Sequence, residues 1–374
     1  MIKILYIVST LKRSGPTSQL YNIIKQLDRT QFDPCLITLS PEPIDSRWED
    51  FEELEVQLHT LGLSRIAGLF SATKNLNHMI EVMQPDLIHS QGIRGDMLSA
   101  GLSIGLPRVC TVRNIPQQDY RMTYGLLQAR WMVGRHRIAM KMMDKCVGVS
   151  HVVSENLRAN LGVQNACTIQ NGVDTEIYTR ALCQEKSALR KKLGLPLAGR
   201  IWITSGHLNA RKDPLFLIDA WKGACVRKSD DSLIFIGSGS LDGECWAAAE
   251  QYSNVFFLGR VSNVADYLKA SDYFLSASKA EGLPNAVLEA LACGLPALLS
   301  DIEPHREIWE MDKNIGDLFL LGDHHSFKSS LAAIVKKERQ TLSDAALDLI
   351  NARLSAQKMS EKYQIIYKEL VNCP

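Results

Sequence analysis

The chain has 374 residues, which is more than one hydrophobic core usually holds, so its length predicts two domains. Hydrophobic residues make up 46% of the chain and charged residues 22%, a composition that excludes a disordered, fibrous or low-complexity protein. Lys and Arg number 42 and Asp and Glu 41. The resulting net charge of +1 excludes a generally basic nucleic-acid-binding protein.

The first residues and the cysteines favour a cytoplasmic location. The apolar run at 4–8 is too short for the core of a signal peptide, and we expect it to be a buried strand. The longest uncharged apolar stretch, 97–107, is shorter than the ~20 residues that cross a bilayer. Nine cysteines form no C-x-x-C motif, so reduced, mostly buried thiols are expected rather than a disulfide or zinc framework.

Short aliphatic runs alternate with longer helical patterns through the first half of the chain. Strands are expected at 2–8, 34–39, 86–89, 108–112 and 145–149, and helices at 19–27 and 152–161. These apolar runs are continuous and do not alternate with polar residues, which is typical of parallel strands covered by helices on both faces. The first half is therefore predicted to be a doubly wound α/β domain.

The second half repeats this α/β rhythm. Strands are expected at 200–205, 232–237, 255–258, 273–276 and 297–299, helices at 214–224 and 284–293, and helix alone from 343 onward. We place a linker near 175–195 and predict an N-terminal domain at 1–180, a C-terminal domain at 181–350, and a helix at 351–374 that packs back on the N-terminal domain. Doubly wound sheets bind ligands at the carboxyl ends of their strands, so the expected active site is a cleft between the halves.

The segment 278–296 contains two glutamates around a predicted helix start. Pro284 is suited to the first helical position and Gly294 to the end of the helix, which puts Glu281 just before the helix and Glu289 inside it. The backbone N–H groups at the helix start form an anion site suited to a diphosphate; they belong to Gly282, Leu283 and Asn285.

A nucleotide sugar matches this spacing. Glu281 would hold hydroxyls of the sugar, the helix start would hold the diphosphate, and Glu289 would hold the ribose. The alternative is that Glu281 only caps the helix and Glu289 lies on its solvated face.

The same residues resemble the Glu-x7-Glu signature of retaining glycosyltransferase family 4, which has the two-domain GT-B fold with two Rossmann-like domains. Further matches follow in chain order at family-like spacing: 147–157, the Asn-Gly-Val-Asp turn at 171–174, the segment 205–212, the turn at 235–239, and 258–261 with Asp266 and Tyr267. The resemblance covers nearly the whole chain and implies the GT-B fold and glycosyl transfer.

The resemblance also implies roles for individual residues. Lys212 would stabilise the diphosphate leaving group, and Glu281 would act with it at the transferred sugar; a solvated Lys at a helix start is the alternative. Gly15 would let the chain approach the donor closely, or would be a plain turn glycine. The implied donor-binding set is Gly15, His207, Arg211, Lys212, Gly237, Arg260, Val261, Glu281, Gly282, Leu283, Pro284, Asn285 and Glu289.

Two departures from the family pattern concern charge and the acceptor side. His207 stands where the family usually has Arg, and Arg211 is close enough in sequence to compensate. The N-domain segment 111–120 reads Thr-x-Arg-Asn with Asp-Tyr at its end, where many relatives have a His. We expect Arg113, as a catalytic group, and Asn114 to contact the acceptor or the donor phosphate. His89 is either an acceptor contact or a hydrogen-bonded structural histidine.

In this family the resemblance implies front-face displacement guided by the leaving diphosphate, without a protein nucleophile. No Asp-x-Asp motif and no His, Cys and Asp cluster with metal-ligand spacing occurs in the sequence. We therefore expect no metal and no cofactor beyond the nucleotide-sugar substrate.

The segment 94–158 contains ten basic and four acidic residues, a local net charge of +6. Its centre, from Tyr120 to Lys145, interleaves Arg and Lys with Trp131 and aliphatic side chains. Such a basic amphipathic pattern favours peripheral contact with an anionic membrane, on the inner face of the cytoplasmic membrane. The alternative is an internal helix with a solvated basic face.

Together these features predict a retaining hexosyltransferase. It would move a hexose or N-acetylhexosamine from a nucleotide sugar, with UDP favoured, to an oligosaccharide or lipid-diphosphate-linked acceptor in O-antigen, capsule or similar polysaccharide synthesis. A GT-B sugar-nucleotide epimerase, a synthase with a soluble acceptor, and an inactive homologue remain as alternatives. An NAD-binding protein is disfavoured, because no G-x-G-x-x-G follows the first strand.

Overall fold

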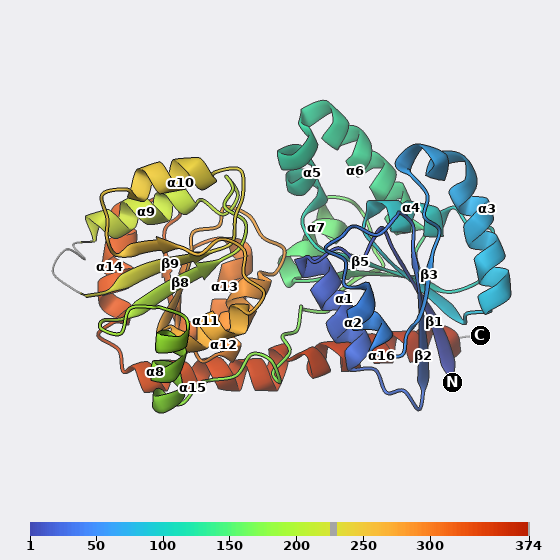
Figure 1. Cartoon of the computed structure of the whole chain (residues 1–374). Coiled ribbons are helices and arrows are strands. Elements are labelled where there is room, and N and C mark those ends of the chain that lie inside the picture. Colours follow the sequence, from blue (N-terminus) through green and yellow to red (C-terminus); the bar gives the residue numbers. More distant parts are fainter. Residues whose placement is uncertain (225–229, 373–374) are drawn as a thin grey trace. The chain divides into compact units, whose positions relative to one another are not determined.

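The computed structural model describes residues 1–224 and 230–372, and the chain divides into two compact units (Figure 1). Unit 1 contains Met1–Gly172 and the chain from Ala356 onward, and unit 2 contains Val173–Ser355. The N–H of Gly172 donates to Gln19 of unit 1 (3.1 Å), whereas that of Val173 donates to the Leu354 carbonyl of unit 2 (2.9 Å). The division therefore falls at this peptide bond, within the Asn-Gly-Val-Asp turn.

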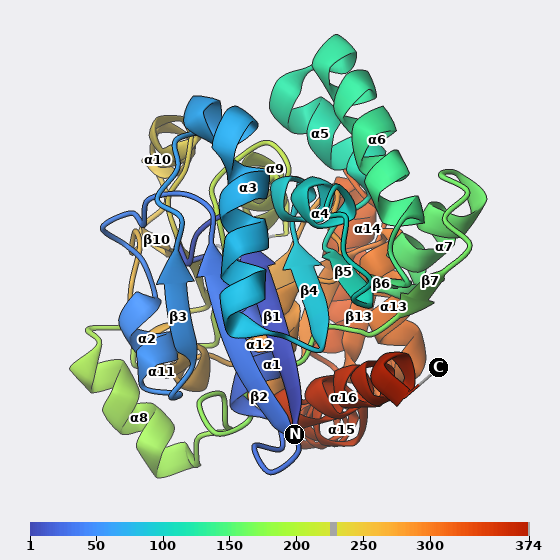
Figure 2. The ribbon, with the colours of Figure 1, turned by 90° about the vertical axis from the view of Figure 1, so that its right-hand side faces the viewer.

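Unit 1 is built on a seven-stranded parallel sheet of order β3-β2-β1-β4-β5-β6-β7 (Figure 2). Ile4 and Tyr6 of β1 belong to one core cluster, and Leu5 and Ile7 to another, so the strand is buried on both faces. This explains why its sequence is continuously apolar. The strands are β1 (Ile2–Val8), β2 (Phe32–Thr38), β3 (Gln57–Thr60), β4 (Leu87–Gln91), β5 (Arg108–Val112), β6 (Lys145–Gly148) and β7 (Ala166–Thr168).

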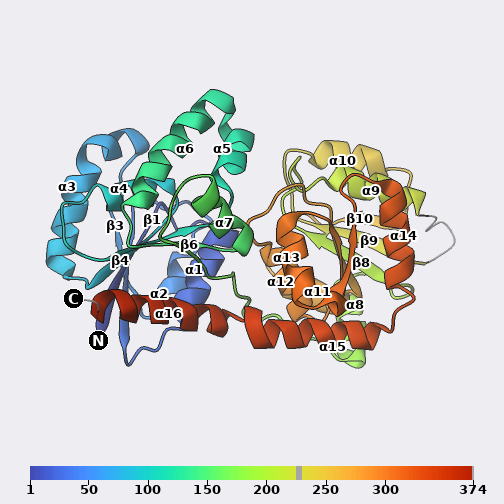
Figure 3. The same ribbon diagram turned by 180° about the vertical axis from the view of Figure 1, so that it is seen from behind.

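Helices cover both faces of this sheet. The helices are α1 (Gly15–Lys25), α2 (Trp48–Glu52), α3 (Arg65–Met83), α4 (Ile93–Ala100), α5 (Pro116–Tyr124), α6 (Leu126–Lys141), α7 (His151–Ala159) and the C-terminal α16 (Ala356–Asn372) (Figure 3). Helix α16 packs beside α1, where the Ser360 hydroxyl donates to the Ile23 carbonyl (2.8 Å) and the hydroxyls of Tyr367 and Tyr6 lie 3.3 Å apart. The end of the chain thus completes the core of the first unit.

Unit 2 repeats the same topology with a six-stranded parallel sheet of order β10-β9-β8-β11-β12-β13. Its strands are β8 (Ile201–Ser205), β9 (Ser232–Ile236), β10 (Val255–Phe257), β11 (Tyr273–Ser276), β12 (Ala297–Ser300) and β13 (Gly316–Phe319). Its helical elements are α8 (Cys183–Lys192), α9 (Pro214–Gly223), α10 (Asp242–Ala249), α11 (Val264–Ala270), α12 (Asn285–Ala292), α13 (Glu303–Met311), η2 (Lys313–Ile315), α14 (His324–Ile334), α15 (Arg339–Leu349) and the π-helical η3 (Ile350–Leu354). Trp202, Trp221 and Phe235 are large members of its core.

In both sheets the strand order reverses next to the first strand, between β1 and β4 in unit 1 and between β8 and β11 in unit 2. The carboxyl ends of strands at such a reversal form the usual ligand site of doubly wound sheets. The confirmed α/β architecture therefore places one candidate site on each unit.

Three local expectations are wrong. The stretch 175–195 is not a linker, because α8 packs within unit 2 through a buried Arg190, which lies 2.5 Å from Asp272. Helix α1 begins at Gly15, four residues early, because the Ser14 side chain caps it and Pro16 fits its first turn. The helical end of the chain is interrupted at Ser355, which has extended dihedral angles.

Candidate active site

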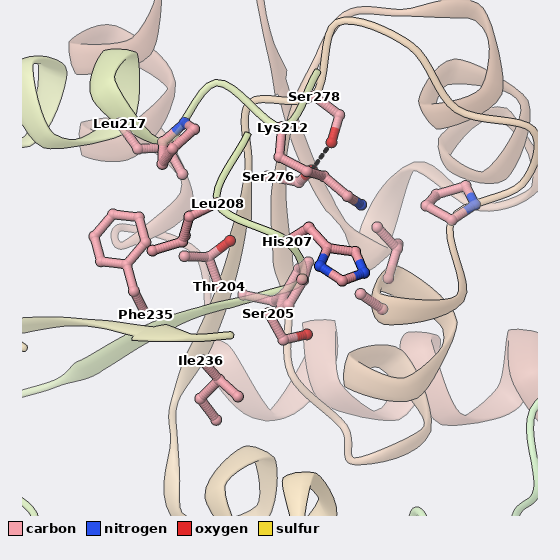
Figure 4. A pocket seen from close by; sticks show the side chains of 16 residues that line it. Thr204, Ser205, His207, Leu208, Lys212, Leu217, Phe235, Ile236, Ser276 and Ser278 are labelled. Atoms are coloured by element: carbon pink, nitrogen blue, oxygen red, sulfur yellow. Dashed lines mark hydrogen bonds between the residues drawn. The ribbon is translucent and has the colours of Figure 1, made fainter. Parts of the chain in front are cut away.

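A small pocket of unit 2 lies at the carboxyl ends of β8, β9 and β11, and is called the unit 2 pocket (Figure 4). Figure 4 shows His207 and Lys212 on the loop that follows β8, near Ser276 and Ser278. Pro284 also lines the pocket. Its volume of about 20 Å³ holds roughly one water molecule. A larger ligand would therefore lie over this edge of the sheet rather than inside the pocket.

Lys212 and Glu281 form an ion pair at this edge, with Nζ 2.5 Å from Oε1. The side chains are 20% and 7% exposed, so the pair is largely withdrawn from water. Burial alone would raise the pKa of Glu281, but the charges of Lys212 and then Arg211 outweigh it and hold this pKa below its ordinary value. Glu281 is therefore an anion at neutral pH, already paired with a cation.

Glu289 lies on α12, half-buried, in a different electrostatic environment. Burial raises its pKa to about 7, although Lys212 and a hydrogen bond with Tyr178 act in the opposite direction. The solvated-face alternative is wrong for this residue. The pKa values of these two carboxylates are thus shifted in opposite directions. At neutral pH Glu281 is fully ionised, and Glu289 is about half-ionised.

The loops after β8 and β9 meet closely, and glycines permit this. Gly237 has φ +125°, and a Cβ there would lie 1.9 Å from the Gly206 carbonyl oxygen. A Cβ at Gly239 would lie 2.2 Å from the Leu208 carbonyl oxygen. A side chain at Gly237 or Gly239 would therefore push the loop after β9 away from the loop after β8, which carries His207 and Lys212.

The start of α12 differs by one residue from the expectation. Pro284 is the N-cap residue, and the helix begins at Asn285. Pro284 has extended dihedral angles there, φ −75° and ψ 107°, so it precedes the helix rather than opening it. Gly282, Leu283 and Pro284 are buried, and Gly294, with φ +70°, ends the helix as expected.

Of the remaining donor-side candidates, His207 lines the unit 2 pocket, whereas Arg211, Arg260 and Val261 lie outside its lining. His207 is exposed, and its Nδ1 lies 3.3 Å from the Ser238 carbonyl oxygen. Arg211 is half-buried and acts on Glu281 through its charge. Arg260 and Val261 follow β10, with Arg260 exposed and Val261 half-buried.

Sequence reasoning missed His305, which is fully buried on α13. Its Nδ1 lies 2.8 Å from the Ser300 carbonyl oxygen and must carry the proton, whereas Nε2 has no partner among the described residues. Burial lowers its pKa to about 4, opposed by the nearby charge of Glu281. A neutral histidine with an unused acceptor thus lies near the ion pair. Its His-Arg-Glu context in the sequence gave no signal of this.

A second and larger pocket, called the unit 1 pocket, has a volume of about 320 Å³. It lies at the carboxyl ends of β1, β4 and β5, where the strand order of the first sheet reverses. Its polar lining comprises Ser9, Thr10, Lys12, Ser14, Thr17, Gln91, Asp96, Thr111, Arg113, Asn114, Asp119, Tyr120 and His136. This volume is at the lower end of the roughly 300–1,000 Å³ typical of small-molecule sites.

Arg113 and Asn114 both line the unit 1 pocket. The Arg113 guanidinium donates to Asn171 Oδ1 (3.0 Å) and to Gln91 Oε1 (2.8 Å), and its Nε has no partner among the described residues. Asn114 donates to Asp119 (3.3 Å). The structure therefore brings these two candidates together and fixes the Arg113 side chain in place.

His89 does not belong to the pocket. It is fully buried, with Nδ1 2.7 Å from the Tyr367 hydroxyl and Nε2 2.8 Å from that of Thr111. Burial lowers its pKa to about 3, and the Arg113 charge contributes. The acceptor-contact interpretation of His89 is therefore wrong, and the structural alternative is correct, because both ring nitrogens are already occupied.

Gly15, the other candidate in the first unit, is not in a loop. It is the first residue of α1, and it is exposed between Ser14 and Pro16, which line the unit 1 pocket. Its contribution at this position is to the helix start rather than to a turn.

Sequence reasoning also missed a buried chain of hydrogen bonds at the unit 1 pocket. His136 Nε2 lies 2.8 Å from Asp96 Oδ2, and its Nδ1 lies 2.7 Å from the Tyr120 hydroxyl. Ser90 donates to the other oxygen of Asp96 (2.6 Å). These residues come from β4, α4, α5 and α6, so spacing along the sequence gave no signal of their contact.

No helix within residues 1–224 and 230–372 is long and apolar enough to cross a membrane. The same residues contain no group of three or more His, Cys, Asp or Glu side chains arranged to hold a metal ion. Seven described cysteines are free thiols, and Cys225 and Cys373 lie outside the described residues.

Two Escherichia coli proteins resemble this chain over more than nine tenths of its length. An Escherichia coli O-antigen biosynthesis glycosyltransferase, WclY, is 24% identical over 99% of both chains. An Escherichia coli UDP-Gal:α-D-GlcNAc-diphosphoundecaprenol α-1,3-galactosyltransferase is 24% identical over 92% of this chain and 91% of its own.

The fold is also found among solved structures, and family models match both halves. The Anabaena protein Alr3699/HepE, solved in complex with UDP, has a TM-score of 0.81 at 16% identity, covering 99% of this chain and all of its own. The family description "Glycosyltransferase Family 4" matches residues 13–177, and "Glycosyl transferases group 1" matches residues 185–352. Two parallel α/β units, the paired glutamates beside Lys212 and these matches agree: the chain is a glycosyltransferase of family 4, with the GT-B fold.

Proposed function

We propose that the protein transfers a hexose or an N-acetylhexosamine, with retention of configuration, from a UDP-sugar to a saccharide linked to a lipid diphosphate in surface-polysaccharide synthesis. Three relatives support this choice by their names: WclY acts in O-antigen biosynthesis, CapH of Staphylococcus aureus in capsular polysaccharide biosynthesis, and a third uses UDP-Gal and a diphosphoundecaprenol acceptor. HepE has been solved with UDP and with UDP-glucose.

The Lys212–Glu281 ion pair is the observation that carries the donor side. Lys212 would neutralise the diphosphate as it leaves, and Glu281 would accept hydrogen bonds from hydroxyls of the transferred sugar. Glu289, on the adjoining helix, would accept from the ribose hydroxyls. The other proposed donor contacts are Gly15, His207, Arg211, Gly237, Arg260, Val261, Gly282, Leu283, Pro284 and Asn285.

The unit 1 pocket would hold the acceptor, with Arg113 and Asn114 among its contacts. A front-face displacement needs no protein nucleophile, because the leaving diphosphate can take the proton of the attacking hydroxyl. We propose that no divalent metal is needed, since the sequence has no Asp-x-Asp motif. A transfer rate that EDTA abolishes and Mg²⁺ restores would contradict this part.

A basic and apolar surface on α5 and α6 supports contact with a membrane. Leu127 is 89% and Trp131 63% exposed, and the Arg135 guanidinium lies 5.9 Å from the Trp131 ring centroid. Arg121, Arg130, Arg137 and Lys141 are also exposed. Exposed aromatic and aliphatic side chains beside several cations match an anionic bilayer surface, where a lipid-linked acceptor resides.

Flotation with vesicles tests the membrane part. Vesicles that contain anionic phosphatidylglycerol should carry the protein upward at low salt, and neutral phosphatidylcholine vesicles should not. Charge reversal at Arg130, Arg135 and Arg137 should abolish flotation, whereas reversal at Lys336 and Lys337 of unit 2 should not. Equal flotation of both variants, or none of the wild type, would contradict membrane docking.

A transfer assay tests the reaction. The purified protein is incubated with UDP-glucose, UDP-galactose, UDP-GlcNAc or UDP-GalNAc and a GlcNAc-diphosphate carried on a short alkyl chain, and the anomeric configuration of the product is read from proton coupling constants. We expect an α-linked disaccharide from one of these donors, and little from the Lys212→Ala variant. An inverted linkage, or no product from any donor, would contradict the proposal.

A further inference from the structure

We propose that Tyr120 binds a hydroxyl group of the acceptor sugar through its phenolic oxygen, and that Asp96 and His136 are positioning residues that fix the direction of its O–H bond. The inference rests on the proposed function only in naming the sugar as the acceptor. Binding of a sugar by the unit 1 pocket can be measured without any transfer reaction.

With a neutral imidazole at His136, these contacts allow one set of hydrogen-bond directions. Asp96 is fully buried and accepts from Ser90 at one oxygen, so its other oxygen takes a bond from His136 Nε2–H. With the ring proton on Nε2, Nδ1 is an acceptor and receives the Tyr120 O–H at 2.7 Å. The lone pairs of the Tyr120 oxygen are then the part of the hydroxyl left for a ligand.

Tyr120 lies where a ligand can reach it. The residue is half-buried and lines the unit 1 pocket together with His136 and Asn114. Burial, and then the charges of Asp96 and Asp119, raise the pKa of Tyr120, so the phenol stays neutral. A neutral phenol with its proton held by His136 accepts a hydrogen bond and donates none to the pocket.

A second, independent observation points to a ligand in the same pocket. Gln91 is 93% buried and lines the pocket, and its Oε1 accepts from Arg113. This bond fixes the orientation of the Gln91 side-chain amide. The NH2 group at Nε2 is then left without a hydrogen-bond partner among the described residues. Buried donors without partners cost stability, and a ligand oxygen would remove that cost.

The pocket therefore presents an acceptor at Tyr120 and a donor at Gln91, and a ligand must offer both kinds of group. Sugar hydroxyls do so, since each donates one hydrogen bond and accepts others. Leu11, Ile93 and Pro116 add apolar lining against which the C–H face of a pyranose ring can pack. The chemistry fits a neutral hexose or N-acetylhexosamine unit.

Saturation-transfer NMR with a panel of methyl glycosides tests the inference. The probes are the methyl α-glycosides of glucose, galactose, mannose, GlcNAc and GalNAc at millimolar concentration, with excess UDP present to occupy a donor site. At least one should bind the wild type. Tyr120→Phe and Gln91→Leu should each weaken it by roughly three- to tenfold, the loss of about one hydrogen bond. Tyr124→Phe, one helical turn away and outside the pocket lining, is the matched control and should leave binding unchanged.

The Asp96→Asn variant separates positioning from simple packing. The carbonyl oxygen of the new Asn can still accept a hydrogen bond from Ser90. Its NH2 group then faces His136 Nε2, which must accept a hydrogen bond from it. The ring proton moves to Nδ1, donates to the Tyr120 oxygen, and turns the phenol into a donor toward the pocket. Binding should weaken as much as in Tyr120→Phe, with both variants keeping the circular dichroism spectrum of the wild type.

Two outcomes would overturn the inference: no glycoside binding the wild type, or binding unchanged in Tyr120→Phe. If Asp96→Asn alone unfolds, the phenylalanine variant still decides the question. Failure of the proposed function looks different. In that case glycosides bind and Tyr120→Phe weakens their binding, yet the protein binds no UDP-sugar and no transfer occurs.

Discussion

The Lys212 ammonium lies 2.5 Å from a carboxylate oxygen of Glu281, although the two residues are 69 positions apart in the sequence. The β8 loop supplies the cation, and the segment before α12 supplies the anion. In the free protein each neutralises the other, and we expect a donor diphosphate to compete with Glu281 for Lys212. The released carboxylate oxygen is then available to a sugar hydroxyl.

Replacement of Lys212 by alanine should lower kcat by roughly 10²-fold or more, because developing charge on the leaving diphosphate loses its stabilising cation. Lys279→Ala is the matched control: Lys279 pairs with Asp213 (2.8 Å) beside the same loop, and this variant should keep the wild-type kcat. Steady-state transfer rates measure both. Equal activity of the Lys212 variant and the wild type would refute the leaving-group role.

The affinity for donor should depend on the ionisation of Glu289. With its pKa raised to about 7 by burial, the carboxyl is mostly protonated at pH 6 and mostly ionised at pH 8, and the anion is the better acceptor for ribose hydroxyls. The donor KM should therefore fall between pH 6 and pH 8. Glu289→Gln should raise KM and reduce this pH dependence, and Glu289→Ala should raise KM by roughly tenfold. An unchanged pH profile in the glutamine variant would count against the ribose role.

The same residue should affect stability in a defined pH window. Its pKa rises from the ordinary 4.5 to about 7 on folding, so its contribution is fully present below pH 4.5 and is lost as pH rises through 7. As pH rises from 5 to 8, the melting temperature of Glu289→Gln should therefore increase relative to that of the wild type. A difference that stays constant over this range would contradict the buried environment.

His89 should contribute to acid sensitivity and not to acceptor binding. Its pKa falls from 6.5 to about 3 on folding, so stability is present above pH 6.5 and is lost as pH falls toward 3. His89→Gln, which also loses ring contacts with Tyr6 and Tyr363, should melt below the wild type at pH 7.5, and the gap should narrow at pH 5. A raised acceptor KM with an unchanged melting temperature would restore the acceptor role.

The sequence predicted the fold and the helix that follows Glu281 well, because both depend on local signals. Continuous apolar runs identify buried parallel strands, and the Pro and Gly around 284–294 bracket a helix. The short edge strands β3 and β13 were not predicted, since edge strands bury fewer side chains and have a weaker apolar pattern.

Contacts between distant residues could not be predicted in the same way. Asp96, His136 and Tyr120 meet only because α4, α5 and α6 pack together, and none of the three carries a motif of its own. His89 was ambiguous because a strand-end histidine can face a pocket or a helix. Helix α16, 278 residues further along the chain, supplies the Tyr367 hydroxyl that decides the question.

The most direct test of the central claim is a thermal-shift titration with UDP, GDP, ADP and CDP and their common sugar conjugates. A ligand that binds only the folded chain raises the melting temperature with its concentration. The account predicts a rise with UDP and a UDP-sugar, smaller in Lys212→Ala and in Glu289→Ala, and equal to the wild type in Lys279→Ala. Two results would contradict a donor site built on Lys212, Glu281 and Glu289. One is a melting temperature that no nucleotide or nucleotide sugar raises, and the other is a rise that is unchanged in both site variants.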